Sequence, residues 1–177
     1  MELTREKLEK ILLLAIDILL NRDFYLLEND VNERTITFKL ASYIEYLLGR
    51  GYDVDCEYNR NISEDSIKKI KAFNQRNEST KTCYSEEDCC KKSCVYPDII
   101  VHRRGSNDNI LIIEVKKKRN IKNNKELEYD KFKLREYTRE GKNGLNYKYG
   151  VLINLGVKEK CGDNDIIWYQ NGEEISY

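Results

Sequence analysis

Residues 97–118 read PDIIVHRRGSNDNILIIEVKKK, two apolar runs on either side of a polar turn. The alternation and the turn near Gly105–Asn109 predict a β-hairpin. Ionisable side chains interrupt both runs, because Asp98 begins the first strand and Glu114 and Lys116 lie inside the second. A carboxylate directly after four apolar residues is costly to bury unless it has a partner, so these residues indicate a function.

The expected pairing of this hairpin brings the charged residues together. Strand side chains alternate between faces, so Glu114 and Lys116 share one face, while Ile113 and Val115 share the other. The start of the first strand in an antiparallel hairpin lies near the end of the second. We therefore expect Asp98 to lie close to Glu114 and Lys116 on a rigid sheet.

Two carboxylates at this distance repel each other unless a cation neutralises them. Oxygen ligands suit a hard ion such as Mg²⁺, which uses one or two carboxylates together with waters and substrate phosphate oxygens. A metal ion makes a bound water more acidic. A neighbouring lysine can orient that water or stabilise charge on a phosphate. The hairpin thus predicts a site that hydrolyses a phosphodiester.

Hydrophobic periodicity predicts the elements around the hairpin. Residues 74–95 are polar and cysteine-rich and are expected to form a loop or an insertion. The whole chain, 1–177, is expected to be one α/β domain with a mixed central sheet flanked by helices. The predicted elements are helices over 3–28 and 33–48, a strand over 52–59, a short polar helix from Ser63 to about Phe73, the hairpin, a charged helix over 123–140, a buried strand over 147–156, and a last strand and turn over 165–177.

Composition argues against a membrane-spanning or secreted protein, but it does not indicate whether the protein binds a polyanion. The 177 residues carry 31 basic and 31 acidic side chains, so net charge neither favours nor excludes a polyanion. The longest apolar run, residues 11–20, contains Asp17 and is too short to span a bilayer. It also lacks the features of a signal peptide. We expect a cytoplasmic protein that does not associate with membranes.

The run PD at 97–98, a spacer and EVK at 114–116 resembles the motif of the PD-(D/E)xK phosphodiesterases, the restriction-endonuclease-like superfamily. The resemblance implies an αβββαβ core, which agrees with the predicted order of elements. The segments NER, EYNR, PDIIVHRRG, EVKK and DKFKL, within residues 31–155, further resemble a group of small, uncharacterised prokaryotic members.

The resemblance also implies roles for individual residues. Asp98 and Glu114 would bind Mg²⁺ or Mn²⁺ with help from the Val115 carbonyl, and Lys116 would lie beside the attacking water. Many members carry a further acidic residue on the first core helix. Glu33 matches that position and could reach the metal through water.

A second group of basic residues is predicted to bind nucleic acid. Residues 116–125 contain six lysines and arginines and no acid, and Lys117, Lys118 and Arg119 would hold the phosphate backbone. The alternative is a solvated strand end. Lys133 is assigned to the same group because, in the resemblance, a polar residue on that helix often faces the site. Its alternative is an exposed salt bridge with Asp130.

Several other residues have open interpretations. His102 is the single histidine and is predicted to be structural rather than a general base. Glu57 and Arg60 could line the cleft or pair with each other. Cys83, Cys89, Cys90 and Cys94 lack the paired spacing of zinc sites, so free thiols are expected, with air-formed disulfides as the next alternative, and zinc or an iron–sulfur cluster is not expected.

These observations predict a Mg²⁺- or Mn²⁺-dependent nuclease that hydrolyses phosphodiesters in DNA. One alternative is a catalytically silent nucleic-acid-binding module of the same fold. Another is a protein-interaction component, for example an immunity or adaptor protein. The sequence shows no dimer face, but small enzymes of this kind often dimerise to cut two strands, so a homodimer is kept as an alternative.

Overall fold

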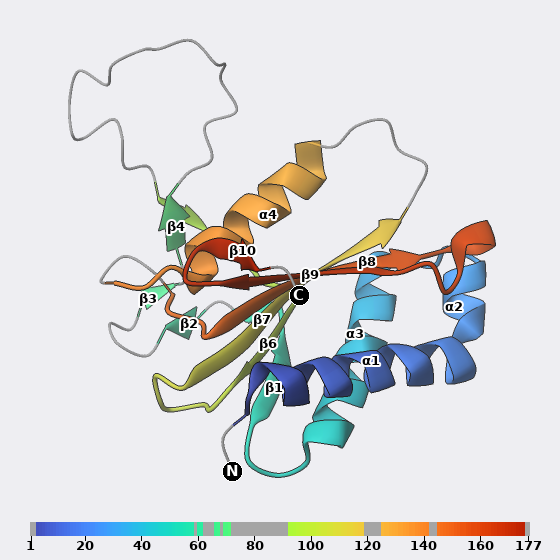
Figure 1. The fold of residues 1–177 in the computed structure, drawn as a ribbon, viewed down its shortest axis with the longest axis horizontal. Coiled ribbons are helices and arrows are strands. Elements are labelled where there is room, and N and C mark those ends of the chain that lie inside the picture. Colours follow the sequence, from blue (N-terminus) through green and yellow to red (C-terminus); the bar gives the residue numbers. More distant parts are fainter. Residues whose placement is uncertain are drawn as a thin grey trace.

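A central mixed sheet organises the computed structural model (Figure 1). The structure describes residues 3–58, 60–61, 66–67, 69–71, 92–118, 125–141 and 145–175, with backbone only for 60–61, 66–67, 69–71, 92–94 and 125. The elements are α1 (Arg5–Arg22), α2 (Phe24–Glu28), α3 (Glu33–Leu48), β1 (Asp53–Cys56), β2 (Arg60–Asn61), β3 (Ser66–Ile67), β4 (Lys69–Lys71), β5 (Lys92–Cys94), β6 (Ile99–His102), β7 (Asn109–Lys118), α4 (Lys125–Thr138), β8 (Tyr149–Gly156), the 3₁₀ turn η2 (Lys158–Lys160), β9 (Asp165–Gln170) and β10 (Glu173–Ile175).

The six-stranded sheet of the described residues runs in the order β1-β6-β7-β8-β9-β10. Strands β7 and β8 are parallel, and every other neighbouring pair is antiparallel. Helix α4 makes the crossover between the two parallel strands, as parallel pairing requires a long connection. The described chain is therefore an α/β protein with a mixed sheet, as the sequence predicts.

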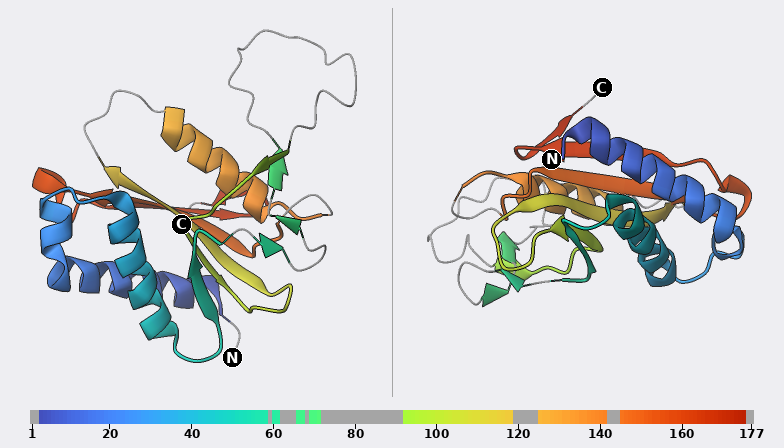
Figure 2. Two further views of the ribbon diagram at one scale, coloured as in Figure 1. Left: turned by 180° about the vertical axis from the view of Figure 1, so that it is seen from behind. Right: turned by 90° about the horizontal axis from the view of Figure 1, so that it is seen from below.

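Two apolar layers cover the two faces of this sheet. On one face, α1 and α3 pack over a layer that includes Ile113, Val115 and Ile153. On the other, α4 packs over a layer that includes Ile112 and Leu152. Figures 1 and 2 show α4 on the opposite side of the sheet from α1 and α3. Every residue of β8 is buried, which explains its continuous apolar sequence.

The first predicted helix, 3–28, is two helices in the structure. The chain leaves helical geometry at Asp23 (φ −120°, ψ 28°), and α2 begins at the next residue. The Asp23 carboxylate accepts a hydrogen bond from the Tyr43 hydroxyl and lies 3.4 Å from the Lys39 ammonium, both on α3. This break turns Leu27 of α2 into the core, where it is fully buried. Tertiary contacts therefore outweigh the local helical pattern.

Helix α3 begins where the sequence predicts. The Asn32 side chain caps it by accepting a hydrogen bond of 2.9 Å from the Arg34 N–H. The loop before it is held to the sheet by Lys117, whose ammonium donates to the Val31 carbonyl at 2.9 Å and lies 2.7 Å from an Asp30 carboxylate oxygen. These contacts fix Glu33, the first residue of α3, against β7.

The short helix predicted from Ser63 to about Phe73 is wrong where the structure describes that range. Residues 66–67 form β3, and residues 69–71 form β4, which pairs antiparallel with β5 at 92–94. Ile67, Ile70 and Phe73 recur at helical spacing, but a helix this short is marginal by itself, and residues 69–71 pair instead with a distant segment. Most of the predicted loop, residues 74–91, lies outside the described residues.

In the part of the chain that the structure describes, no helix is both long enough and apolar enough to cross a membrane.

Candidate active site

The β6–β7 hairpin brings Asp98 and Glu114 together, as its sequence predicts. Ile99 pairs with Ile113, which places Asp98 opposite Glu114 on the adjacent strand. One Asp98 carboxylate oxygen accepts a hydrogen bond of 2.7 Å from the Val115 N–H. This bond fixes the Asp98 carboxylate at the end of the hairpin. The structure thus places Val115 at the site through its backbone, while its side chain packs in the core.

Glu114 lies on the face of the sheet that α4 covers, and its side chain is fully buried. The Lys133 ammonium lies 2.6 Å from one of its carboxylate oxygens. The Tyr137 hydroxyl donates a hydrogen bond of 3.1 Å to the other. Both partners come from α4, four residues apart and on one helix face. Glu114 is therefore a buried carboxylate whose two oxygens both have partners.

Lys116 connects the hairpin to both flanking layers. Its ammonium lies 3.3 Å from a Glu33 oxygen at the start of α3 and 3.5 Å from an Asp130 oxygen on α4. The other Glu33 oxygen accepts a hydrogen bond of 3.2 Å from the Lys117 N–H. Asp130 also binds the Lys133 ammonium at 2.6 Å. The predicted residues Glu33, Asp98, Glu114 and Lys116 therefore form one cluster, which includes Asp130 and Lys133.

Burial dominates the proton equilibria of the two hairpin carboxyls. Burial raises the pKa of Glu114 to about 8, against the stabilising charge of Lys133 and with added repulsion from Asp98. Burial also raises the pKa of Asp98, although the Val115 N–H and Lys116 oppose that shift. The positive charge near each carboxyl is therefore too small to offset the cost of burying its ionised form.

The lysines of the cluster are held in their charged forms. Burial lowers the pKa of Lys116, but the Asp130 and Glu33 carboxylates outweigh it, so the pKa lies above its usual range. For Lys133, burial is likewise outweighed by Glu114 and Asp130, and its pKa is raised. Both side chains are therefore hydrogen-bond donors at neutral pH and not bases.

The cluster contains more carboxylates than ammonium groups. Among the described side chains, four carboxylates (Glu33, Asp98, Glu114 and Asp130) face two ammonium groups (Lys116 and Lys133). The excess is two negative charges when all are ionised, and one when Glu114 keeps its proton. One buried Asp130 oxygen, Oδ2, accepts no hydrogen bond, although the Lys116 ammonium lies 3.5 Å from it. No group of three or more described His, Cys, Asp or Glu side chains is arranged to hold a metal alone. Mg²⁺ takes few protein carboxylates and completes its shell with water and phosphate oxygens, so carboxylates of this cluster could hold it only together with such ligands.

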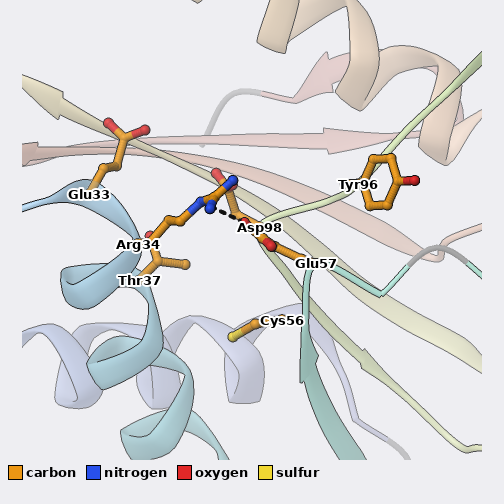
Figure 3. Close-up of a pocket in the computed structure, with 7 residues that line it drawn as sticks. All are labelled: Glu33, Arg34, Thr37, Cys56, Glu57, Tyr96 and Asp98. Carbon is orange, nitrogen blue, oxygen red and sulfur yellow. Dashed lines mark ion pairs between the residues drawn. The ribbon is translucent and has the colours of Figure 1, made fainter.

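A pocket of about 610 Å³ opens beside the hairpin (Figure 3). The start of α3, the end of β1 and the segment before β6 form its walls. Asp98 and Glu33 lie on the wall nearest the cluster, so a bound molecule would reach the carboxylates from this side. The lining residues are Glu33, Arg34, Thr37, Cys56, Glu57, Tyr96 and Asp98.

Two of the three basic residues predicted to hold the phosphate backbone, Lys117 and Lys118 at the end of β7, already have ion-pair partners. Lys117 is almost completely buried, with 6 % of its side chain exposed, and binds the loop at Asp30. Lys118 lies 2.7 Å from Asp163 and 3.1 Å from Asp165. The acids that neutralise them come from distant segments, which a local count of charges does not include. Arg119 lies outside the described residues, so its predicted role stays a prediction.

Lys133 is placed in the carboxylate cluster and not on a surface that faces a nucleic acid. The predicted surface pair with Asp130 exists, but it is buried. Lys133 therefore contacts Glu114 and Asp130, and the exposed salt bridge that was its alternative is not what the structure shows. Binding of nucleic acid by Lys133 stays a prediction.

Other candidate residues have structural partners. His102 is buried, with its Nε2 2.8 Å from an Asp55 oxygen, in agreement with the predicted structural role. Glu57 lines the pocket and lies 2.9 Å from Arg34. Cys56 and Cys161 are free thiols. Cys83, Cys89 and Cys90, and the side chains of Cys94 and Arg60, lie outside what the structure describes.

Sequence reasoning missed two sets of residues. Tyr137 follows Asp130 and Lys133 at positions i+7 and i+4 of one helix, so helical spacing could have placed it with them. The pocket residues Arg34 and Tyr96 flank predicted site residues, one after Glu33 and the other two before Asp98. The sequence signal that could have identified Arg34 and Tyr96 is therefore their proximity to Glu33 and Asp98.

Searches of protein-family models, of curated proteins and of solved structures found no match to this chain.

Proposed function

We propose that this protein is a divalent-cation-dependent nuclease that hydrolyses phosphodiesters in DNA, with a restriction-endonuclease-like fold. The order α3, β1, β6, β7, α4, β8 supports the fold, since it corresponds to an αβββαβ core with a mixed sheet. The EVK segment lies in β7 and the PD segment directly precedes β6, as the resemblance implies.

One observation carries the proposal. Asp98 and Glu114 lie opposite each other at the end of a rigid hairpin, both with a raised pKa, beside a lysine that remains protonated. Asp98 and Glu114 repel each other when both are ionised, and Lys133 and Tyr137 offset only part of the cost of burying Glu114. A bound cation would favour both ionised forms, which supports a site for a cation and a phosphate.

The residues of the chain have distinct tasks in this proposal. Asp98, Glu114 and the Val115 carbonyl would hold Mg²⁺ or Mn²⁺. The cation, when bound, would acidify water and neutralise phosphate charge. Lys116, kept protonated by Asp130 and Glu33, donates a hydrogen bond to the attacking water or to a phosphate oxygen.

Glu33, Lys133 and Tyr137 act as positioning residues. Glu33 holds the Lys116 ammonium and is itself fixed by the Lys117 N–H. Lys133 and Tyr137 set the orientation of the Glu114 carboxylate from α4. Such supporting contacts commonly affect metal affinity or activity by about 10–100-fold.

A cleavage assay tests the proposal. Plasmid and single-stranded DNA are incubated with wild-type protein in Mg²⁺, Mn²⁺ or EDTA, and with Asp98→Asn, Lys116→Ala and the control Lys131→Ala. Lys131 lies on α4 but pairs with the half-exposed Glu128 and not with the carboxylate cluster. We expect metal-dependent cutting by wild type and the control, and loss of cutting in the two site variants.

Metal-dependent cutting that survives both Asp98→Asn and Lys116→Ala would contradict the assignment of the site. Absence of cutting by folded wild type on every substrate would contradict the nuclease.

A catalytically silent nucleic-acid-binding module is the second candidate. The observation that favours it is the 2.6 Å contact between Lys133 and Glu114, because an ammonium group already neutralises one proposed metal ligand. A module of this kind would bind nucleic acid equally well in Mg²⁺ and in EDTA, and would not cut it.

A further inference from the structure

Among the described residues that line the pocket beside the hairpin, Tyr96 is the one aromatic side chain, and most of it is exposed. Tyr96 lines the cavity with 58 % of its surface exposed, two residues before Asp98. Figure 3 shows its ring on the side of the pocket opposite Glu33 and Arg34. An exposed ring at the mouth of a pocket offers a flat apolar face to whatever enters.

Arg34 provides a positive group on the facing wall. Its side chain is 82 % exposed and lies 2.9 Å from Glu57, which is itself half-exposed. An exposed ion pair of this kind contributes little to stability and exchanges partners readily. The guanidinium is therefore available to bind a phosphate, for which its planar fork is well suited.

The backbone between these residues is held in place. Glu57 adopts a left-handed conformation (φ 50°), and its N–H donates to the Asp98 carbonyl at 3.4 Å. This bond ties the end of β1 to the start of the hairpin, so the pocket wall and the proposed metal ligand move together. The cavity is of the size that small-molecule sites occupy, about 300–1,000 Å³.

We propose that this pocket receives one unpaired nucleotide of a single-stranded substrate, with its base stacked on Tyr96 and a backbone phosphate near Arg34. The inference rests on the proposed function and names its substrate class. Aromatic side chains stack on bases of any sequence, but only on bases that are not already stacked in a duplex. Single strands, flaps or frayed ends therefore fit the pocket better than an intact double helix.

The charge of the pocket indicates where the phosphates and the base of a bound nucleotide would lie. The three carboxylates of its lining, Glu33, Glu57 and Asp98, repel phosphates unless a cation is present. Phosphates would therefore approach through the Asp98 side together with the metal, or at Arg34. The uncharged base occupies the side of Tyr96.

Fluorescence anisotropy with a labelled oligothymidylate and a hairpin duplex of equal length tests the inference. Ca²⁺ replaces Mg²⁺ so that binding is measured without turnover. The variants are Tyr96→Ala, the conservative Tyr96→Phe, and the control Tyr46→Ala, which removes a tyrosine that is 80 % exposed on α3 but does not line the pocket. Since Tyr96 is on the surface, its loss should leave the thermal melt unchanged.

We expect wild type to bind the single strand more tightly than the duplex, and Tyr96→Ala to weaken single-strand binding by about 5- to 100-fold. Tyr96→Phe and Tyr46→Ala should stay within about twofold of wild type, and duplex binding should not change in Tyr96→Ala. Unchanged single-strand affinity in Tyr96→Ala, an equal loss on the duplex, or a preference of wild type for the duplex would overturn the inference.

The two proposals fail in distinguishable ways. A protein that cuts DNA with metal but is indifferent to Tyr96→Ala refutes the nucleotide pocket alone. A protein whose single-strand binding depends on Tyr96 but that never cuts refutes the nuclease alone.

Discussion

Glu114 is the residue whose ionisable side chain is most difficult to reconcile with its burial in the fold. It follows a run of apolar residues in a buried strand, yet it is ionisable, and burial raises its pKa from the ordinary value of 4.5 to about 8. The contacts from Lys133 and Tyr137 reduce that cost without removing it. A cation next to Asp98 would remove more of it, which is why this position points to a binding site.

The pH dependence of stability follows from this shift. Between about pH 4.5 and 8 the folded protein keeps a proton on Glu114 that the unfolded chain releases, so the free energy of unfolding falls as pH rises. We expect metal-free wild type to lose on the order of 2–4 kcal/mol from about pH 5 to pH 9. Glu114→Gln should lose most of this slope, measured by urea unfolding in EDTA.

The matched control is Glu128→Gln, which changes an exposed glutamate on α4 that pairs with Lys131. It should keep the wild-type slope. A Glu114→Gln protein whose stability falls with pH as steeply as wild type would show that Glu114 is ionised throughout the range.

Lys133 should be more important for stability than the neighbouring surface lysine. Its replacement in Lys133→Met leaves Glu114 and Asp130 without their common ammonium group, which should cost about 3–5 kcal/mol in EDTA. Lys131→Met should cost less than about 1 kcal/mol, since its pair is near the surface. Thermal unfolding with and without Mg²⁺ measures both.

Mg²⁺ should raise the melting temperature of Lys133→Met more than that of wild type, because the cation replaces the lost positive charge. An equal shift in the two proteins would mean that the cation does not bind near Lys133.

At the scale of elements, the local pattern predicts the hairpin, α3 and β8, because their periodicity and capping signals agree with the final structure. It fails at 66–71, where pairing with residues 92–94 decides the structure, and at Asp23, where contacts with α3 break a helix. The candidate site follows the same division. Asp98 and Glu114 could be placed from the hairpin alone, whereas the pairing of Lys117 with Asp30 depends on how the layers meet.

Gly156, the last residue of β8, packs tightly against the backbone of the turn that follows. A Cβ added at Gly156 would lie 1.8 Å from the Lys160 carbonyl oxygen, which is backbone and cannot rotate away. Gly156→Ala should therefore destabilise the protein by about 3 kcal/mol or more. Chemical denaturation measures the loss.

Gly150 in the same strand is the matched control. Its added Cβ would meet side-chain atoms of Thr138 and Leu134 at 3.0 and 3.2 Å, which can shift slightly. Gly150→Ala should cost about 1 kcal/mol. Equal losses in the two variants would contradict the tight turn at Gly156.

At the scale of the whole molecule, one sheet supports two different layers. α1 and α3 form an apolar layer with β7 on one face, while α4 brings both apolar residues and the polar partners of Glu114 to the other. The carboxylate cluster and the pocket lie where the start of α3 meets the hairpin. The site therefore depends on the packing of both layers, and its geometry is a property of the complete fold.

Direct binding of Mn²⁺ is the measurement that tests the central claim, the divalent-cation site at Asp98 and Glu114. Titration calorimetry compares wild type with Asp98→Asn, which keeps an acceptor for the Val115 N–H, and with the control Asp163→Asn on the surface. We predict saturable binding to wild type and to the control, weakened more than about tenfold in Asp98→Asn. Equal affinities in wild type and Asp98→Asn, or no saturable binding to wild type, would contradict the account.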